Sequence, residues 1–146
     1  MQYRPFLPRE QVPLLYSLAD VGLVSLKKDI VMESVPSKTY TIMAAAKAVL
    51  ATVDEYTEVG CLLRQAQCGI CVEPENPVSL AEAVVNLYQH PAQCREYGQR
   101  ARAYVTANYS RQVASRQYDQ LIQQLLSPEP ASLQPLPNPT GVQNER

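Results

Sequence analysis

Three apolar runs of strand length lie in the first half of the chain, and segments with helical spacing separate them. The runs cover residues 21–26, 48–53 and 69–73. Strands that are almost continuously apolar and alternate with helices are typical of a parallel sheet covered on both faces. The pattern therefore predicts an α/β fold built on a parallel sheet.

The segments before and between these runs have the apolar spacing of helices. A short helix is expected to end at Asp20, just before the first run. The spacing predicts a second helix over residues 36–46 and a third over 55–67. The third has acidic residues in its first turn, which suit the positive end of a helix dipole.

The last third of the chain is predicted to be helical. Asn76 and Pro77 are typical of a cap and a first helical residue. The apolar face of that helix is expected to comprise Leu80, Ala81, Val84, Leu87 and Tyr88. Another helix starts near Ala92, and Ser110 is expected to cap the next. The apolar stripe of this last helix comprises Ala114, Tyr118, Leu121, Ile122 and Leu125.

Composition and length predict one domain over residues 1–126 and a Pro-rich disordered tail over 127–146, where repeated prolines forbid helix. The net charge of −1, from 13 basic and 14 acidic residues, gives no broad attraction to nucleic acid. No apolar run approaches the roughly 18 residues of a membrane span, and the N-terminus lacks a signal-peptide core. We therefore expect a cytoplasmic protein without an integral membrane segment.

The cysteines raise the question of a metal or redox site. Cys68 and Cys71 have CxxC spacing. On a strand, a residue and its third neighbour point to opposite faces, so the two thiols are expected not to converge. The chain has no second CxxC, and its one histidine, His90, precedes a proline in a predicted loop. We expect no metal site and no cofactor, with buried cysteines acting as small hydrophobes.

The most informative segment is residues 33–53, which places a polar turn directly before the second predicted helix. Pro36 suits the first helical position, and Ser34 or Ser37 can cap the first N–H groups. A helix N-terminus presents unpaired N–H groups and the positive dipole end, and Lys38 adds a positive charge. The segment predicts an anion-binding loop, although plain capping by Pro36 and Ser37 would leave the same pattern.

Taken in order, these pieces resemble the C-terminal domain of the retaining glycosyltransferases of family 4, which have two Rossmann-like domains (the GT-B fold). The similarity runs from about Tyr3 to Leu126. It is carried by residues 15–20, Pro36-Ser37-Lys38, Met43-Ala44, the runs 49–53 and 68–72, residues 103–110 and the helix containing Tyr118. It is greatest to the Pro-Ser-Lys subgroup that builds bacterial surface polysaccharides. The implied fold is a partial Rossmann-like parallel sheet flanked by helices.

The resemblance also implies roles for individual residues. In that family a Glu-x7-Glu signature spans the anion loop. Glu33 matches its first glutamate, which lies beside the donor sugar. The residues implied to bind the donor are Glu33, Ser34, Val35, Pro36, Ser37, Lys38 and Thr41. Thr41 stands where the family has the second, ribose-binding glutamate, so weaker ribose binding is expected. Thr41 could equally back-bond to its own helix, and Glu33 could be an ordinary surface carboxylate.

Two further departures lie on the same motif. The family favours glycine where Ala46 stands and proline where Ala48 stands. A glycine closing the helix would permit a left-handed backbone, a conformation that costs alanine about 1 kcal/mol. The family's acceptor-binding N-terminal domain and the first strands of the C-terminal domain have no counterpart here, so the stripe of Tyr118, Leu121 and Leu125 is expected to lack a cover. Exposed apolar surface of that kind implies a partner chain, a homo-oligomer or an incomplete chain.

The leading hypothesis is therefore a fragment or split piece of a retaining glycosyltransferase. The whole enzyme would transfer a sugar from a UDP- or GDP-sugar to a polysaccharide or lipid-linked acceptor, and that acceptor would bring it to the inner membrane surface. We do not expect this chain alone to catalyse transfer. The second hypothesis is a non-catalytic remnant or interaction module that keeps the fold. The third, a thiol-redox or metal module, rests only on Cys68 and Cys71.

Overall fold

A computed structural model describes residues 8–28 and 35–126 of the chain. Its core is a three-stranded parallel sheet in the order β1-β2-β3, formed by β1 (Val21–Ser25), β2 (Ala48–Thr52) and β3 (Gly69–Val72). Leu23 lies beside Leu50, and Leu50 lies beside Ile70. The predicted α/β class and the three strands are confirmed, with ends that differ by about one residue. The predicted disordered tail lies outside the described residues.

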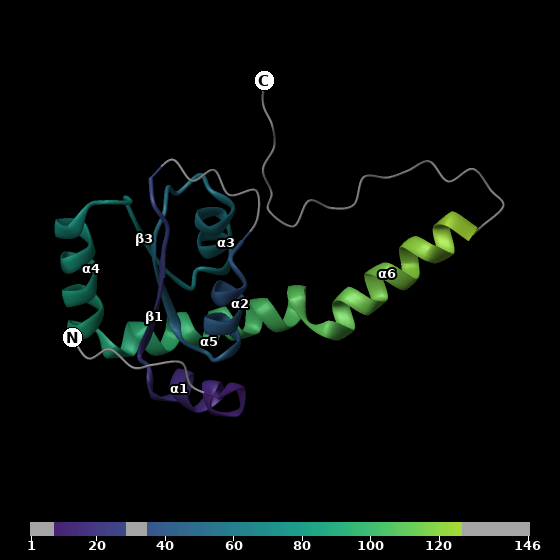
Figure 1. Ribbon diagram of the computed structural model, residues 1–146, viewed down its shortest axis with the longest axis horizontal. Coiled ribbons are helices and arrows are strands. Elements are labelled where there is room, and N and C mark those ends of the chain that lie inside the picture. Colours follow the sequence, from purple (N-terminus) through teal and green to yellow (C-terminus); the bar gives the residue numbers. More distant parts are fainter. Residues whose placement is uncertain (1–7, 29–34, 127–146) are drawn as a thin grey trace, which may run out of the picture.

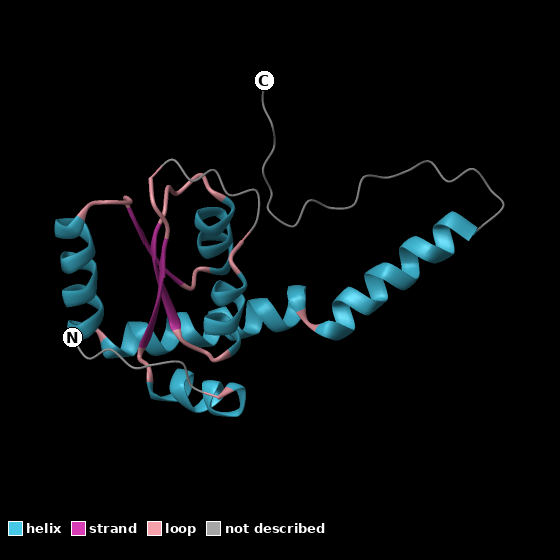
Figure 2. Ribbon diagram, viewed as in Figure 1, coloured by secondary structure: helices cyan, strands magenta, loops and turns pink. Residues whose placement is uncertain are grey.

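Helices connect the strands and continue after them (Figures 1 and 2). They are η1 (Arg9–Gln11), α1 (Val12–Leu18), α2 (Ser37–Ala44), α3 (Glu58–Ala66), α4 (Pro77–Gln89), α5 (Pro91–Tyr109) and α6 (Arg111–Leu126). Figure 1 shows α2 and α3 on one side of the sheet and α4 on the other. The long helix α5 crosses beneath the sheet, and α6 extends away from it.

The face of the sheet that carries α2 and α3 is called the closed face here, because its side chains are fully covered. Its buried cluster comprises Val24, Ile42, Met43, Val49, Ala51, Val53, Val59, Leu62, Leu63, Ala66, Cys68, Ala101 and Val105. Gly22 of β1 allows α2 to lie close, since a Cβ there would come within 2.5 Å of the Ile42 side chain. Burial of this cluster is what fixes α2 against the sheet.

The opposite face is called the open face. Its smaller buried cluster comprises Ala48, Leu50, Ala83, Leu87 and Cys94. Among the described residues, α4 and the first turns of α5 cover it. The predicted apolar stripe of α4 is partly wrong, because Leu87 and Ala83 are buried whereas Val84 is 51% and Tyr88 86% exposed. The side chains of Val84 and Tyr88 have no neighbouring element of the described chain to cover them.

Two helix ends use a left-handed residue that is not glycine. Ala46 has φ 56° after α2, and Gln67 has φ 47° after α3. At Ala46 the backbone closes with Lys47 N–H donating to Ile42 O at 3.2 Å and Ala46 N–H donating to Met43 O at 3.0 Å. This is the pattern of a Schellman motif. Ala46 thus adopts the left-handed backbone that a glycine would permit at this position.

Two predicted helix starts differ from the structure, that of α3 by three residues and that of α2 by one. The third helix begins at Glu58 rather than Glu55, because Asp54 accepts from Tyr56 N–H at 2.9 Å and forms a turn before it. Thr57 then caps the helix by accepting from Gly60 N–H at 3.2 Å. Helix α2 begins at Ser37 and ends at Ala44, which leaves Pro36 at the cap position and not in the helix.

The later helix caps match the prediction. The Asn76 side chain accepts from Ser79 N–H at 3.0 Å, and the Ser110 hydroxyl accepts from Val113 N–H at 3.4 Å. Helix α6 buries none of its residues, and Tyr118, Ile122 and Leu125 are all more than half exposed. Within the described part of the chain, its apolar stripe is therefore uncovered, as the sequence predicts.

Candidate functional site

The first turn of α2 follows β1 in the chain, and its residues Ser37 and Lys38 are exposed. Pro36 has φ −55° and ψ 132°, and its carbonyl accepts from Thr39 N–H at 2.9 Å. Among the described residues no side chain caps this helix, so the predicted capping role of Ser37 is not observed, and Ser34 lies outside the described residues. The first N–H groups of a helix have no acceptor within it, and they lie at the positive end of its dipole.

The structure places five of the seven predicted donor-binding residues, since Glu33 and Ser34 lie outside the described residues. Ser37 and Lys38 are exposed at the start of α2. Pro36 is half-buried, and Val35 packs against the closed-face cluster. Within the described chain Lys38 has no ion pair, which leaves its ammonium group available to an anion.

Thr41 lies one turn further along α2 and is exposed. Its hydroxyl donates to the Ser37 carbonyl at 3.1 Å, which is the back-bond that the sequence left open as an alternative. The hydroxyl oxygen keeps lone pairs that can accept one further hydrogen bond. Thr41 can therefore accept from a sugar hydroxyl, but it cannot supply the charged acceptor of a glutamate.

Thr39, which the sequence did not single out, is the buried polar residue of this turn. It is 0% exposed, and its Oγ1 has no hydrogen-bond partner among the described residues. A buried hydroxyl without a partner costs about 1–3 kcal/mol. No sequence signal could have identified it, because the helical spacing alone does not decide which threonine faces the core.

Polar residues also gather where the strands end. The Thr52 hydroxyl donates to Ser25 Oγ at 2.9 Å, which joins the last residues of β2 and β1. Lys28 and Glu73, which follow β1 and β3, form an ion pair at 4.0 Å. Both of these side chains are more than half exposed, so the pair adds little stability. In open α/β sheets ligands bind at this carboxyl edge. In the sequence, the polar residues that follow the apolar runs indicate where this edge lies.

A tyrosine cluster supports α2 from the side of α5. The rings of Tyr40 and Tyr109 lie 4.8 Å apart and those of Tyr104 and Tyr109 lie 6.3 Å apart. The Tyr104 hydroxyl donates to Gln65 Oε1 at 2.8 Å. Burial raises the pKa of Tyr40 and Tyr109, so both hydroxyls stay neutral. The cluster braces the helix that carries the open turn.

The prediction that Cys68 and Cys71 point to opposite faces is wrong. Cys68 lies in the turn before β3, where strand alternation does not apply, and both side chains pack against the closed-face cluster. Burial raises the pKa of Cys68 to about 12 and that of Cys71 to about 11. Both thiols are therefore protonated at neutral pH, whereas nucleophilic and metal-binding cysteines act as thiolates.

Residues 8–28 and 35–126 contain no group of three or more His, Cys, Asp or Glu side chains that could hold a metal ion. No helix within these ranges is both long and apolar enough to span a bilayer. His90 lies exposed between α4 and α5, with Nδ1 2.8 Å from the Asn86 carbonyl.

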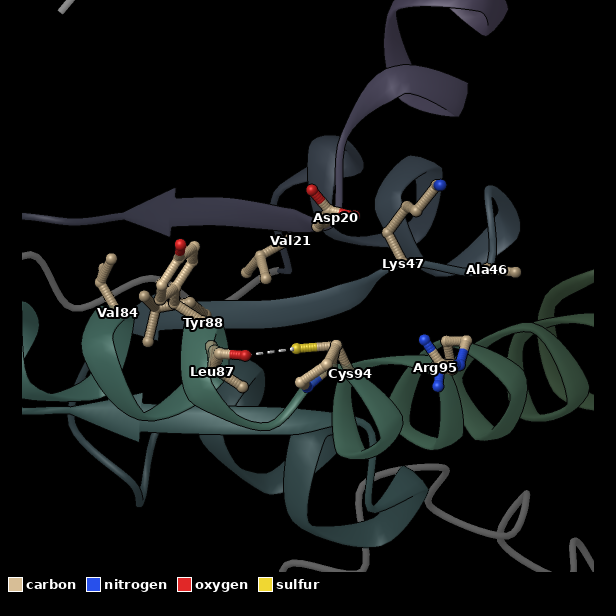
Figure 3. Close-up of a pocket in the computed structure, with 11 residues that line it drawn as sticks. Asp20, Val21, Ala46, Lys47, Val84, Leu87, Tyr88, Cys94 and Arg95 are labelled. Atoms are coloured by element: carbon tan, nitrogen blue, oxygen red, sulfur yellow. Dashed lines mark hydrogen bonds between the residues drawn. The ribbon is translucent and has the colours of Figure 1, made fainter.

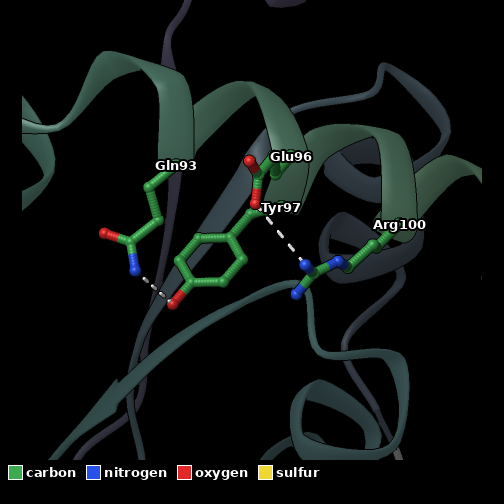
Figure 4. Close-up of polar contacts among 4 residues, drawn as sticks. All are labelled: Gln93, Glu96, Tyr97 and Arg100. Atoms are coloured by element: carbon green, nitrogen blue, oxygen red, sulfur yellow. Dashed lines mark hydrogen bonds and ion pairs between the residues drawn. The ribbon is translucent and has the colours of Figure 1, made fainter.

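Two other regions of the molecule hold polar contacts or a hollow. On α5, Gln93 donates to the Tyr97 hydroxyl at 3.0 Å, and Arg100 pairs with Glu96 at 3.5 Å (Figure 4). These contacts link residues one helical turn apart, so they stabilise α5 and do not form a site. A hollow of about 620 Å³ lies at the amino-terminal end of the strands, away from the first turn of α2 (Figure 3).

Comparison with known proteins shows which family the chain resembles. The model of the family "Glycosyl transferases group 1" matches residues 1–104. The chain is 27% identical over 127 residues to "Probable glycosyltransferase WbjE" of Pseudomonas aeruginosa. This aligned region makes up 87% of the chain and 31% of the relative. It is 31% identical over 104 residues to "Putative colanic acid biosynthesis glycosyl transferase WcaI" of Escherichia coli K12. This second aligned region makes up 68% of the chain and 26% of the relative.

No solved structure matches the chain. The chain spans less than a third of the length of these two relatives. The family match, however, covers more than two thirds of the chain, including β1, β2, β3 and α2. These findings agree with the Rossmann-like parallel sheet and its helices. The chain therefore belongs to the glycosyl transferases group 1 family.

Proposed function

We propose that this chain is the donor-binding part of a retaining glycosyltransferase. The whole enzyme would transfer a sugar from a nucleotide diphosphate, UDP or GDP, to a polysaccharide or lipid-linked acceptor. The observation that carries this proposal is the first turn of α2, which no described side chain caps, in a chain of this family. The name of the E. coli relative, which refers to colanic acid biosynthesis, supports a polysaccharide acceptor.

The donor diphosphate would lie at the start of α2. Free N–H groups and the dipole of a helix N-terminus favour phosphate, and Lys38 would add a charged hydrogen bond. Ser34, Val35, Pro36 and Ser37 would line the turn. Glu33 would position the donor sugar, and Thr41 would accept a hydrogen bond from the ribose.

The leaving diphosphate gains negative charge as the glycosidic bond breaks. Fixed N–H groups and the Lys38 ammonium, held where that charge develops, would stabilise the transition state more than the ground state. The tyrosine cluster of Tyr40, Tyr104 and Tyr109 supports this role because it holds α2 in place without contributing charge. The acceptor and its general base would be supplied by the part of the enzyme that this chain does not match.

Calorimetric titration with UDP- and GDP-sugars tests the proposal. The proteins are the chain itself and a hybrid protein, in which this chain replaces the matched segment of the P. aeruginosa relative. Lys38→Met is expected to weaken donor binding about tenfold, because a charged hydrogen bond to phosphate is lost. Lys47→Met, three residues after the end of the same helix, is the control and should leave donor affinity unchanged. Equal affinity of the Lys38→Met variant and the native chain would contradict the proposed site.

An alternative is a remnant that keeps the fold without donor binding. It is favoured by Thr41, whose hydroxyl is already bonded to its own helix, and by Ala46, which holds a strained left-handed backbone. The same titration separates the two functions. Absence of binding to every UDP- and GDP-sugar, in both the chain and the hybrid protein, would favour the remnant.

A further inference from the structure

Helix α2 is short, and its first turn, residues 37–40, is called the donor turn here because we propose that the donor binds there. The helix has eight residues, which gives it a length of about 12 Å. A helix this short has little stability of its own, so the surfaces that it packs against set its direction. Ile42 and Met43, both 0% exposed, fix one side of it against the sheet. The two ends of such a helix move together, so a contact at its carboxyl end also orients the donor turn.

The carboxyl end of α2 receives a hydrogen bond from a distant part of the chain. The last four carbonyl groups of a helix need partners from beyond its regular hydrogen bonds. The last of them, that of Ala44, accepts from Nη1 of Arg102 at 3.3 Å. The other three are satisfied by the backbone that follows: the carbonyls of Thr41, Ile42 and Met43 accept from the N–H groups of Ala45, Lys47 and Ala46 at 3.0, 3.2 and 3.0 Å.

Arg102 belongs to α5 and lies 58 residues after Ala44 in the sequence. Gly98, one turn earlier on α5, allows the close approach of the two segments, because a Cβ there would overlap the Ala46 carbonyl. Ala101, next to Arg102, is 0% exposed and belongs to the closed-face cluster. A positive charge is also favourable at the carboxyl end of a helix, where the dipole is negative. Arg102 therefore joins α2 to α5 at the end opposite to the donor turn.

The backbone that Arg102 holds is strained. Ala46 has φ 56°, a left-handed conformation that residues other than glycine adopt only at a cost in free energy. Strain of this kind persists where the surrounding contacts hold the backbone in place. The hydrogen bond from Arg102 to the Ala44 carbonyl is such a contact, two residues before the strained position.

A second contact from α5 reaches the donor turn itself. The ring of Tyr109, the last residue of α5, lies 4.8 Å from the ring of Tyr40. Tyr40 is the last residue of the donor turn, whereas Arg102 bonds to the last residue of the helix. Helix α5 therefore holds α2 at both ends, by a ring contact at one and by a charged hydrogen bond at the other.

We propose that Arg102 is a positioning residue for the donor turn. By holding the carboxyl end of α2, it aims the free N–H groups of the donor turn, and the Lys38 side chain, at the donor diphosphate. Groups that are held in place before the donor arrives need no reorganisation when it binds or reacts. The proposal rests on donor binding at α2 and assigns part of it to a residue at the opposite end of the helix.

Arg100 and Arg102 provide a matched test. Both are exposed on α5, but Arg100 pairs with Glu96 of its own helix at 3.5 Å. In calorimetric titration of the hybrid protein with UDP- and GDP-sugars, Arg102→Met should weaken donor affinity about fivefold, because the donor turn is less well aimed. Arg100→Met should leave donor affinity unchanged. Arg102→Lys keeps a positively charged donor and should recover most of the affinity.

A contact that only keeps the protein folded gives a different result in the same titration. Partial unfolding lowers the number of binding sites per chain and leaves the affinity of the remaining sites unchanged. That result for Arg102→Met would overturn the proposal, and so would equal donor affinities of Arg102→Met and Arg100→Met. If the hybrid protein without substitutions binds no donor, the proposed function fails, and the position of α2 is then decided by hydrogen exchange.

Amide hydrogen exchange tests the same contact without a donor. The N–H of Ala45 reports on the end held by Arg102, and the N–H of Thr39, which donates to Pro36 O at 2.9 Å, reports on the donor turn. Arg102→Met should speed the exchange of both amides about fivefold, and Arg100→Met should change neither. Faster exchange at Ala45 alone would mean that Arg102 only caps the helix, and it would overturn the proposal. Unchanged exchange at both amides would overturn it as well.

Discussion

The two faces of the sheet are built from equally apolar strands, yet they differ in how they are covered. On the closed face, Ile42 and Met43 of α2 are 0% exposed. On the open face, Leu23 is 42% exposed, whereas the next residue of the same strand, Val24, belongs to the closed-face cluster and is only 3% exposed. The apolar content of a strand shows that both of its faces favour burial. Whether a face is in fact buried depends on which helices pack against it in the folded chain. Substitutions on the two faces should therefore have unequal effects.

The largest contrast is expected between Ile42 and Leu23. Ile42→Ala removes a side chain that is fully buried against Gly22 and should lower the free energy of unfolding by about 2–5 kcal/mol, because a cavity remains. Leu23→Ala removes a side chain that is already partly in water, so we expect a loss of about 1 kcal/mol or less. Urea unfolding of both variants measures the difference. Losses of similar size would show that the open face is covered in solution.

Thr39 offers a stabilising change on the closed face. Thr39→Val keeps the shape of the side chain and removes a buried hydroxyl without a partner, so stability should rise by about 1–2 kcal/mol. Thr41→Val is the exposed control on the same helix and should change stability by about 0.5 kcal/mol or less. Thermal unfolding distinguishes the two. A loss of stability in Thr39→Val would reveal a hydrogen bond that the hydroxyl makes in solution.

The buried thiols of the closed face predict a pH dependence. The pKa of Cys68 is raised from 9.0 to about 12, so between these values the unfolded chain loses a proton that the folded chain keeps. The contribution of this thiol to the free energy of unfolding is fully present below pH 9 and is lost as pH rises. The loss between pH 9 and pH 10 is about 1 kcal/mol. Unfolding measured at both pH values checks this. Cys68→Ala should reduce the slope, and an unchanged slope in that variant would refute the assignment.

The smallest effect is expected at Ala46, which lines the hollow of the open face. Ala46→Gly relieves the left-handed backbone at φ 56° and should stabilise the chain by about 0.5–1 kcal/mol. Ala44→Gly, in the last turn of α2, is the control and should destabilise by about the same amount. Chemical unfolding of the two variants should give changes of opposite sign. Two losses would mean that the backbone at Ala46 is not left-handed in solution.

Much of the fold followed from local pattern. The three strands were predicted to within about one residue, because a short continuous apolar run between polar turns has few other interpretations. The caps at Asn76 and Ser110 were also predictable, since a cap depends on neighbouring backbone N–H groups. The start of α3 was not predictable. The pattern favoured a helix that begins at the acidic residues from Glu55 on, but Asp54 holds these residues in a turn by accepting from Tyr56 N–H.

The candidate site was only partly predictable. The open turn before Ser37 followed from the sequence, and so did the strain at Ala46. The burial of the Thr39 side chain and the hydrogen bond between Thr52 and Ser25 did not follow from the sequence. Burial and contacts between strands depend on register and on neighbours far along the chain. The same limit explains the error at Cys68, which lies just outside the strand that was assumed to orient it.

The sequence by itself determined the strand and helix order, the parallel sheet and the polar turn at its carboxyl edge, because these depend on local spacing and on the hand of the chain. Only the tertiary structure decided which apolar side chains are covered. Packing of α2, α3 and α5 closes one face, whereas Leu23 and Val84 remain exposed on the other. Burial is a property of neighbours in space, and the hydrophobic pattern of one segment cannot specify them.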